Sequence, residues 1–369
     1  MRILTVVALS SPRGEYGGPT RVAVNQAVEL QRQGHDVTIA AGARGYDGEL
    51  PGELDGVPAA LFPVRQVLPG SGFAGISAPS LRRALPRLAE SADVIHVHLA
   101  RDLLTLPVAG WARRHRVPYV LQTHGMIAPT SNPLAAPLDA LMTRRVLRGA
   151  RKVLYLTPHE RDDLIEVAGA ELSLSRLGNG VPIPEQARTT SGEPELLYLA
   201  RLAPRKRPQL FVEMARRLAR EFPLASFRLV GPDEGAAEEV ERLIAESRNE
   251  ANIRWEGPIA PEDVSSRMAK AAVYVLPAVD EPYPMSVLEA MAMGIPVVIT
   301  ESCGLAPLVR ESGSGVVVGT GADDLVSGVR RLLAEPEHAA ECGRRARLTA
   351  KERLGMPAIA RHLEAAYSA

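Results

Sequence analysis

Two glutamates in the C-terminal half of the sequence are the first residues whose spacing suggests chemistry. Glu281 and Glu289 are separated by seven residues. A carboxylate can accept two hydrogen bonds from neighbouring hydroxyl groups, so two acids at one site are candidates for holding a vicinal diol. An acid near the start of a helix is often only a partner of the helix dipole, and this alternative stays open for either glutamate alone.

The elements around these glutamates place them near one end of a sheet. Residues 272–276 are a short apolar run, which is typical of a buried strand. Residues 285–293 contain strong helix formers and end at Gly294, as expected of a helix stopped by a glycine. A second buried strand is predicted at 297–300. Glu281 is therefore expected in the loop beyond a strand's carboxyl end, where open parallel sheets bind ligands, and Glu289 about one turn into the helix.

This segment resembles the signature of a known enzyme family. Glu281 and Glu289, followed by Ala-Met-Ala-x-Gly-x-Pro-Val-Val, are similar to the pattern of the retaining glycosyltransferases of family 4, the group 1 enzymes with the GT-B fold. The resemblance implies that Glu281 contacts the donor sugar and that Glu289 holds the ribose of the nucleotide. Tyr283-Pro284 stands where Phe-Gly is frequent. Because proline has no backbone donor, the amides of Met285 and Ser286 are expected to hold the sugar.

A second motif supplies positive charge. Arg201 and Lys206 resemble the family's Gly-Arg-Leu-x-x-x-Lys-Gly element, with Ala200 and Arg207 in place of its glycines. The resemblance implies that Arg201 and Lys206 stabilise the charge that develops on the departing diphosphate and so replace a divalent metal. The neighbouring Arg205, like Arg207, is expected to be solvated.

Other positions complete the predicted site. Gly17 and Gly18 precede a predicted helix, where backbone amides can approach an anion. A plain loop is the alternative interpretation. The resemblance implies that this segment contacts the donor diphosphate. His124 follows a predicted strand at 117–122, and the usual near-neutral pKa of histidine would let it donate or accept a proton. The resemblance places His124 near the anomeric carbon, mainly for orientation and polarity. Backbone groups near Ile259 are expected to read the base.

No metal or cofactor is expected. His96 and His98 lie on one face of a predicted strand, but no third ligand is evident nearby, so packing or polar lining is the default interpretation. Asp233-Glu234 is not an Asp-x-Asp motif. Cys303 and Cys342 lack metal-ligand spacing and are predicted to be reduced thiols in a cytoplasmic protein.

Composition limits the possible partners. The 369 residues are 46% hydrophobic and 23% charged, with no formal net charge, which are globular values. Residues 1–180 carry 20 basic and 16 acidic side chains. That excess is too weak to predict nucleic-acid binding, but it could favour an anionic membrane surface or acceptor. The basic amphipathic segment 81–88 could contact phospholipid or an anionic acceptor, and a solvated helix face is the alternative.

No run of residues approaches the ~18 apolar residues of a membrane span, so any membrane contact is expected to be peripheral, at the inner face of the plasma membrane. The apolar start at residues 1–8 reads as a first strand and not as a signal peptide.

The expected fold is α/β: a GT-B fold of two Rossmann-like, doubly wound domains that face each other across a cleft. The predicted domains are an acceptor-side domain at 1–180, a linker at 181–194, a donor-binding domain at 195–352 and a helix at 353–369 that packs back on the first domain. The Gly-, Pro- and Ser-rich residues 42–80 are expected to form an acceptor-side loop.

The resemblance implies metal-independent, retaining transfer of a sugar from a nucleoside-diphosphate sugar of the UDP or GDP type. The acceptor would be a carbohydrate or a lipid-linked molecule in polysaccharide or glycolipid synthesis. Two alternatives stay open. One is a nucleotide-sugar epimerase or hydrolase on the same fold, and the other is a non-catalytic subunit that binds a nucleotide sugar.

Overall fold

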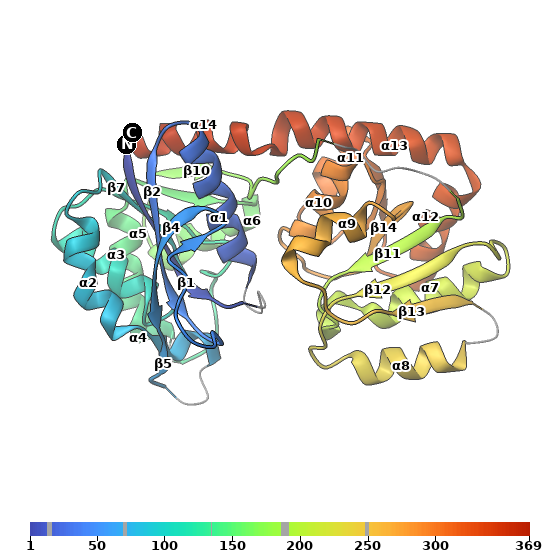
Figure 1. Cartoon of the computed structure of the whole chain (residues 1–369), viewed down its shortest axis with the longest axis horizontal. Helices are drawn as coiled ribbons and strands as arrows, with labels where there is room; N and C mark the ends of the chain where they lie inside the picture. The colour runs from blue at the N-terminus through green and yellow to red at the C-terminus, as the bar shows by residue number, and fades with distance from the viewer. Residues whose placement is uncertain (13–16, 69–71, 134, 186–191, 248–250) are drawn as a thin grey trace. The chain divides into compact units, whose positions relative to one another are not determined.

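The computed structural model describes residues 1–12, 17–68, 72–133, 135–185, 192–247 and 251–369. The chain forms two compact units (Figure 1). Unit 1 contains Met1–Gly180 and Met356–Ala369, and unit 2 contains Val181–Gly355. Each unit is an α/β layer structure built on one main sheet.

The sheet of unit 1 is parallel except at one edge. Its order is β10-β9-β8-β7-β1-β2-β4-β3, and only the edge pair β3–β4 is antiparallel. The chain adds strands on one side of β1 (Arg2–Ser10) and then on the other, so the winding reverses between β1 and β7. The other strands are β2 Asp36–Ala43, β3 Glu53–Leu54, β4 Val57–Pro63, β7 Val94–His98, β8 Tyr119–Gln122, β9 Lys152–Tyr155 and β10 Leu174–Arg176.

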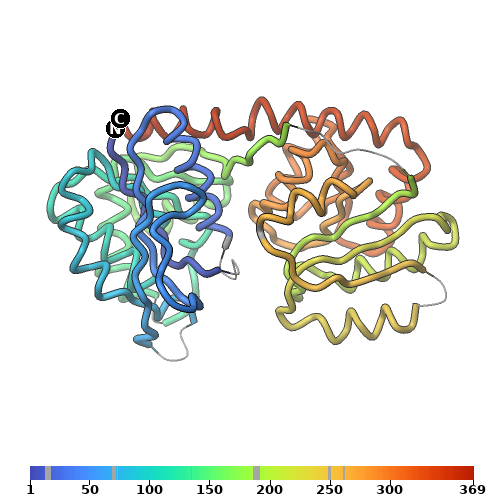
Figure 2. Tube along the Cα trace, in the orientation of Figure 1, coloured from blue at the N-terminus to red at the C-terminus, as the bar shows by residue number. Residues whose placement is uncertain are grey.

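Helices cover both faces of this sheet because alternate residues of its strands point to opposite sides. Ile3 and Val7 of β1 pack with α1 (Gly17–Arg32) and α14 (Met356–Ser368). Leu4 and Val6 pack on the other face, with α2 Pro79–Ala89, α3 Thr105–Arg114, α5 Arg144–Gly149 and α6 Pro158–Ala168. Two short segments, α4 (Ala135–Leu138) and a π-helix (Asp139–Thr143), precede α5. Figure 2 shows α14 running beside α1, with both chain ends at the same edge of unit 1.

Residues 42–80 do not form the single loop that their composition suggested. Within them β4 joins the main sheet, with Ile39 of β2 opposite Ala59. A small antiparallel pair, β5 (Arg65–Gln66) and β6 (Ile76–Ser77), follows with a 3-10 turn at Gly72–Gly75. The pairing of β4 with β2 supplies backbone partners that the Gly- and Pro-rich composition did not reveal.

The sheet of unit 2 is parallel in all six strands, in the order β13-β12-β11-β14-β15-β16. This is the doubly wound order in which the chain reverses direction between the first and fourth strands. Its strands are β11 Glu195–Leu199, β12 Ser226–Val230, β13 Asn252–Trp255, β14 Val273–Leu276, β15 Val297–Thr300 and β16 Gly315–Val318. The helices are α7 Pro208–Ala219, α8 Ala237–Glu246, α9 Val264–Met268, α10 Met285–Met293, α11 Ala306–Ser312, α12 Ala322–Ala334 and α13 Pro336–Thr349. The loops after β11 and β14 therefore meet at the switch point.

The segment around α10 forms for local reasons. Val273–Leu276 and Val297–Thr300 are fully buried, and α10 ends at Gly294, whose φ of 78° is left-handed. In the segment expected to be a linker, Val181 donates its backbone N–H to Leu354 at 2.8 Å, and residues 186–191 lie outside the described residues. Among the described helices, none is both long and apolar enough to cross a lipid bilayer.

Candidate functional site

The loop after β11 carries the candidate cations Arg201 and Lys206. A 3-10 turn at Pro204–Lys206 brings the second cation back toward the sheet, with the Lys206 amide bonded to the carbonyl of Ala203 at 2.9 Å. Arg207 follows with φ 53° and ψ 50°, in the left-handed region. This conformation explains why a glycine suits that position in the family motif, since a residue with a Cβ adopts it at a cost of about 1 kcal/mol.

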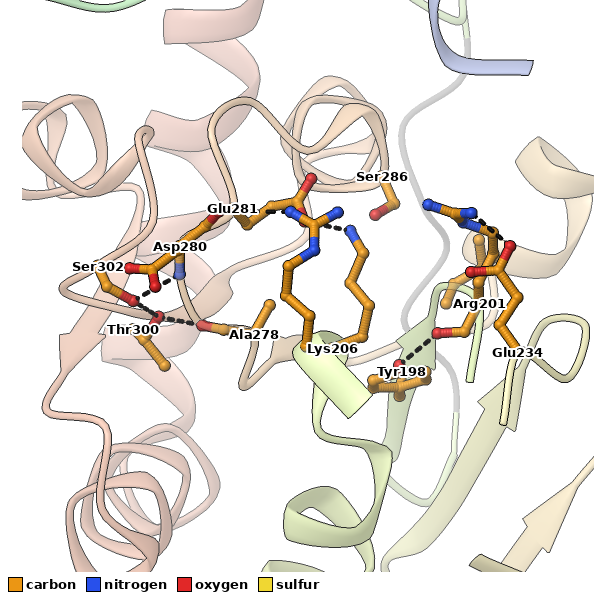
Figure 3. A network of polar contacts seen from close by, with 12 residues as sticks. Tyr198, Arg201, Lys206, Glu234, Ala278, Asp280, Glu281, Ser286, Thr300 and Ser302 are labelled. Carbon is orange, nitrogen blue, oxygen red and sulfur yellow. Dashed lines mark hydrogen bonds and ion pairs between the residues drawn. The ribbon is translucent and has the colours of Figure 1, made fainter. Parts of the chain in front are cut away.

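A buried ion pair joins this loop to the loop after β14. Lys206 Nζ lies 2.6 Å from Glu281 Oε2, and both side chains are about 10% exposed. Arg205 Nη1 contacts the same carboxylate oxygen at 3.0 Å. Arg205 is exposed, as expected of a solvated side chain, but it also belongs to this ion pair. Burial lowers the pKa of Lys206, and the nearby Glu281 carboxylate opposes that shift. The two loops at the switch point are thus tied together by opposite charge (Figure 3).

The loop that carries Glu281 is fixed from both sides. Val279 donates its backbone N–H to the carbonyl of Arg205 at 3.0 Å. On the other side the backbone N–H of Gly304 bonds the Glu281 carbonyl at 2.9 Å, and that of Asp280 bonds Ser302 Oγ at 3.2 Å. Asp280 itself has a positive φ of 49°. Such backbone strain persists only where neighbouring contacts hold it, and here they aim the Glu281 side chain at Lys206.

Arg201 lies beside a different carboxylate. Its guanidinium forms an ion pair with Glu234, in the loop after β12, and both side chains are partly exposed. The hydroxyl of Tyr198 donates to the Arg201 carbonyl at 3.0 Å, and the Glu234 amide bonds the carbonyl of Leu202 at 3.0 Å. Figure 3 shows Arg201 and Lys206 extending toward the start of α10, where Ser286 lies. The spacing of Arg201 and Lys206 pointed to both cations, but no local pattern pointed to Glu234.

The start of α10 has no side-chain cap. Pro284 is its N-cap residue, and no side-chain cap hydrogen bond closes this end. The first amides of a helix have no partner within the helix, so those of Met285 and Ser286 can bind an anion or a hydroxyl. The Ser286 hydroxyl is 2.6 Å from that of Tyr274, whose pKa burial raises. Glu289 is half-buried in the same helix, and its charge contributes to the raised pKa of Tyr274.

Gly231 allows the ends of β11 and β12 to approach closely. A Cβ on Gly231 would lie 2.0 Å from the carbonyl oxygen of Ala200, and the φ of Gly231 is 145°. The indole of Trp255 donates to the Gly231 carbonyl at 3.0 Å. Ile259, further along, is half-buried against the core of unit 2. The sequence-predicted residues of unit 2 thus gather at the carboxyl ends of β11 to β14.

In unit 1 the candidate His124 follows β8 in a strained turn. His124 has φ 51° and Gly125 has φ 74°. Glu160, buried in the first turn of α6, holds this turn: its Oε1 accepts from Thr123 Oγ1 at 2.6 Å and from the Gly125 amide at 2.5 Å. Its Oε2 accepts from the Leu156 amide at 2.6 Å. The sequence contains a signal for Glu160, since it stands three residues after Thr157 as in a capping box, but this contact with a distant turn is tertiary.

His124 is half-buried and lies in a neutral environment. Its Nε2 lies 2.7 Å from His98 Nδ1. Burial lowers the pKa of His124 to about 4, partly offset by a hydrogen bond with Asn179, and the near-neutral pKa expected for this histidine is therefore wrong. Burial also lowers the pKa of His96, to about 3, and His96 Nδ1 lies 2.9 Å from the hydroxyl of Tyr367. At neutral pH all of these rings are uncharged.

Two other predictions concern metals and the first loop. Within the described ranges, no group of three or more His, Cys, Asp or Glu side chains is arranged to hold a metal ion. Cys303 and Cys342 are free and buried, and burial raises the pKa of Cys303 to about 11. Helix α1 begins at Gly17, where a Cβ on Gly18 would meet no atom within 4 Å. Residues 13–16, which precede these glycines, lie outside the described residues.

Comparison with known sequences assigns both halves of the chain to glycosyltransferase families. Residues 182–349 match the family described as glycosyl transferases group 1, and residues 17–180 match the glycosyl transferase 4-like domain. A D-inositol 3-phosphate glycosyltransferase of Nocardia farcinica is 26% identical over 90% of this chain and 80% of its own length. One from Kineococcus radiotolerans is 28% identical over 90% of this chain and 86% of its own length.

Comparison with solved structures shows the same fold. HepE of Anabaena, in complex with UDP and glucose, has a TM-score of 0.77 at 19% identity, over 100% of this chain and 99% of its own. TarM of S. aureus has a TM-score of 0.78 at 13% identity, over the whole of both chains. Identities this low concern the fold alone, and that fold is GT-B, with two Rossmann-like domains. Both halves of the chain match glycosyltransferase domains in sequence, so it is a glycosyltransferase of the GT-B fold and belongs to the glycosyl transferases group 1.

Proposed function

We propose that this enzyme transfers a sugar from a nucleoside-diphosphate sugar, with retention of configuration and without a metal ion. The observation that carries the proposal is the buried pair Lys206–Glu281, 2.6 Å apart, at the switch point of unit 2 and beside the uncapped start of α10. A buried lysine that turns from its carboxylate to the donor supplies positive charge in a place of low dielectric, where charge on a leaving diphosphate is most strongly stabilised.

Each residue at the switch point has a role in this proposal. Lys206 and Arg201 bind the diphosphate, and Glu289 accepts hydrogen bonds from the ribose. Glu281 and the amides of Met285 and Ser286 hold the hydroxyls of the sugar. Backbone groups near Ile259 contact the base, and Gly17 and Gly18 of unit 1 supply amides to the diphosphate.

Arg205 belongs with these residues. Its guanidinium is 3.0 Å from Glu281 Oε2 and about 44% exposed, so it can move when a donor binds. With Arg201 and Lys206 it makes three cations at the site, paired in this structure with the two carboxylates of Glu234 and Glu281. In the proposal these cations turn from the carboxylates to the diphosphate and take the place of a divalent metal. The proposal therefore expects full activity in the presence of a chelator.

The proton chemistry follows from the neutral state of His124. A histidine with a pKa of about 4 is uncharged at neutral pH and carries no proton to give as a strong acid. We assign His124 to orientation of the acceptor or the sugar. The acceptor hydroxyl attacks from the side of the leaving group, and its proton passes to the departing phosphate oxygen. This route gives retention with no further protein base.

The identity of donor and acceptor is a finer proposal. Structural neighbours were solved with UDP or UDP-glucose, which supports a UDP-sugar donor, with GDP as the other candidate. The relatives named D-inositol 3-phosphate glycosyltransferase support a small polar acceptor. A carbohydrate or lipid-linked acceptor in polysaccharide or glycolipid synthesis is our broader proposal, with peripheral contact at the inner membrane face if the acceptor is lipid-linked.

The test is proton NMR of the reaction mixture with UDP-glucose and a panel of acceptors, with and without EDTA. The expected product keeps the axial anomeric configuration of the donor, and EDTA leaves the rate unchanged. An inverted product or an EDTA-sensitive rate would overturn the mechanism. Donor consumption without any acceptor would favour an epimerase or hydrolase. Nucleotide binding with no consumption of any donor would favour a non-catalytic subunit.

A further inference from the structure

A hollow of about 380 Å³ lies on unit 1 between helices α2 and α3, and the glycosyl-transfer proposal does not use it. Three of its lining side chains are arginines, Arg82 and Arg83 from α2 and Arg114 from the end of α3. Leu85, Trp111 and two prolines supply the rest of the lining. The volume is within the range of small-molecule sites, which combine apolar walls with a few charged groups.

The charge around this α2–α3 pocket is one-sided. Helices α2 and α3 carry five arginines and no aspartate or glutamate. Among the residues that the structure describes, Arg82, Arg83 and Arg114 form no ion pair with a carboxylate. Exposed arginines elsewhere do pair: Arg242 with Glu239, and Arg330 with Glu221. Three unpaired guanidinium groups around one hollow therefore leave a positive site without its own counter-charge.

Helix formation alone does not account for these arginines. The dipole of a helix stabilises cations in its last turn, which suits Arg114 at the end of α3. It gives no such benefit to Arg82 and Arg83, near the start of α2. The buried side of α2 is formed by Leu81, Leu85 and Ala89, so the core does not require arginine at the exposed positions either.

The apolar side of the pocket also restricts the kind of ligand that fits. One face of the Trp111 indole is stacked on the imidazole of His115, with ring centroids 4.3 Å apart. Trp111 is nevertheless only half-buried, and together with Pro79 and Pro107 it contributes apolar surface to the pocket, whereas Leu85 is 2% exposed. An inorganic anion would leave that surface wet, whereas a compact ring carrying an anionic group would cover it.

We propose that the α2–α3 pocket binds a phosphate ester whose organic part is a small ring. Guanidinium groups pair with phosphate oxygens through two parallel hydrogen bonds, and the ring lies against the exposed part of Trp111. The hollow favours a discrete molecule, because a flat anionic lipid surface needs no cavity. This site lies wholly within unit 1 and uses none of the donor-binding residues of unit 2.

Trp111 provides a direct reporter, because the chain has only two tryptophans. In a Trp255→Phe variant, titration with cyclohexyl phosphate should give a saturable change in the fluorescence of Trp111. Inorganic phosphate should bind more weakly, and cyclohexanol should give no change. Calorimetry on the unmodified chain measures the same affinity independently, and Lys206→Met should leave it unchanged, which separates this site from the donor site.

Charge reversal with a matched control decides the assignment. Arg83→Glu should weaken cyclohexyl phosphate binding about tenfold or more, since it removes a charge-assisted contact. Arg87→Glu changes the net charge of the same helix by the same amount, but Arg87 does not line the pocket. The affinity of the Arg87→Glu variant for cyclohexyl phosphate should therefore stay within about twofold of that of the unmodified chain. No saturable response, or an equal loss in both variants, would overturn the proposal. The proposal would also be overturned if cyclohexyl phosphate does not bind and the protein instead sediments with vesicles of phosphatidylcholine and phosphatidylglycerol in a way that depends on Arg83.

Discussion

Replacement of Lys206 by methionine would test the buried ion pair at the switch point. The two side chains are similar in length, so Lys206→Met removes the charge and keeps most of the packing. The Glu281 carboxylate would remain buried, with Arg205 Nη1 at 3.0 Å as its remaining partner in the described site. Because that arginine is about 44% exposed, solvent screens its interaction with Glu281.

The expected loss of stability follows from these contacts. Removal of one partner from a buried pair typically costs about 3–5 kcal/mol, and the remaining contact with Arg205 should reduce this to about 2 kcal/mol. For a unit of this size that corresponds to a fall of roughly 4–8 °C in the melting temperature. The double variant Lys206→Met/Glu281→Gln should recover most of this loss, because it leaves no unpaired buried charge, and Arg205, which also loses its partner, is about 44% exposed and therefore solvated.

Differential scanning calorimetry measures the stabilities, and a transfer assay measures the rates. Arg205→Met is the matched control and should lower stability by less than about 1 kcal/mol, since it removes only the partly exposed partner. Turnover should fall by about a hundredfold or more in Lys206→Met, and the double variant should not recover it. The reasoning is refuted if Lys206→Met is as stable as the wild type, or if the double variant is no more stable than the single one.

Three further predictions concern the supporting residues. Gly231→Ala should lower the free energy of unfolding of unit 2 by about 3 kcal/mol, measured by urea unfolding, because the new Cβ meets the Ala200 carbonyl. Gly235→Ala is the control: its Cβ meets open space, so it should cost only about 1 kcal/mol. Glu160→Gln should lower turnover about tenfold without changing the donor KM, since it loosens the turn at His124. An unchanged turnover would contradict the role of Glu160 in holding this turn. Because the pKa of His96 is lowered to about 3 from 6.5, the unfolded chain binds more protons below pH 6.5. Stability should therefore fall as pH drops through that window, by about 3 kcal/mol for this group at pH 4, and His96→Gln should flatten the decline.

The sequence predicted the parts of unit 2 that depend on local patterns. Apolar runs marked β14 and β15, and Gly294 marked the end of α10, where the structure has a left-handed residue. The position of Glu281 beyond a strand end followed from the same pattern. The GT-B fold expected from the motifs is confirmed by the comparisons with solved structures.

The features that the sequence did not reveal depend on contacts between distant segments. The sequence does not predict the contact of Arg205 with Glu281, because the two residues are 76 positions apart and the 3-10 turn that carries Arg205 has no strong local signal. The prolines and small residues of β4 predict a loop, whereas its pairing with β2 makes it a strand. The lowered pKa of His124 is not predicted from the sequence, because its main cause is desolvation, which depends on tertiary packing.

The most direct test of the proposed donor site is isothermal titration calorimetry of UDP with the wild type and with Glu289→Ala. The account predicts that UDP binds the wild type without any added metal and that the variant binds it about tenfold to a hundredfold more weakly, because the ribose hydroxyls lose their charged acceptor. Unchanged UDP affinity in Glu289→Ala, with the fold intact by circular dichroism, would contradict the assignment of this helix to the nucleotide.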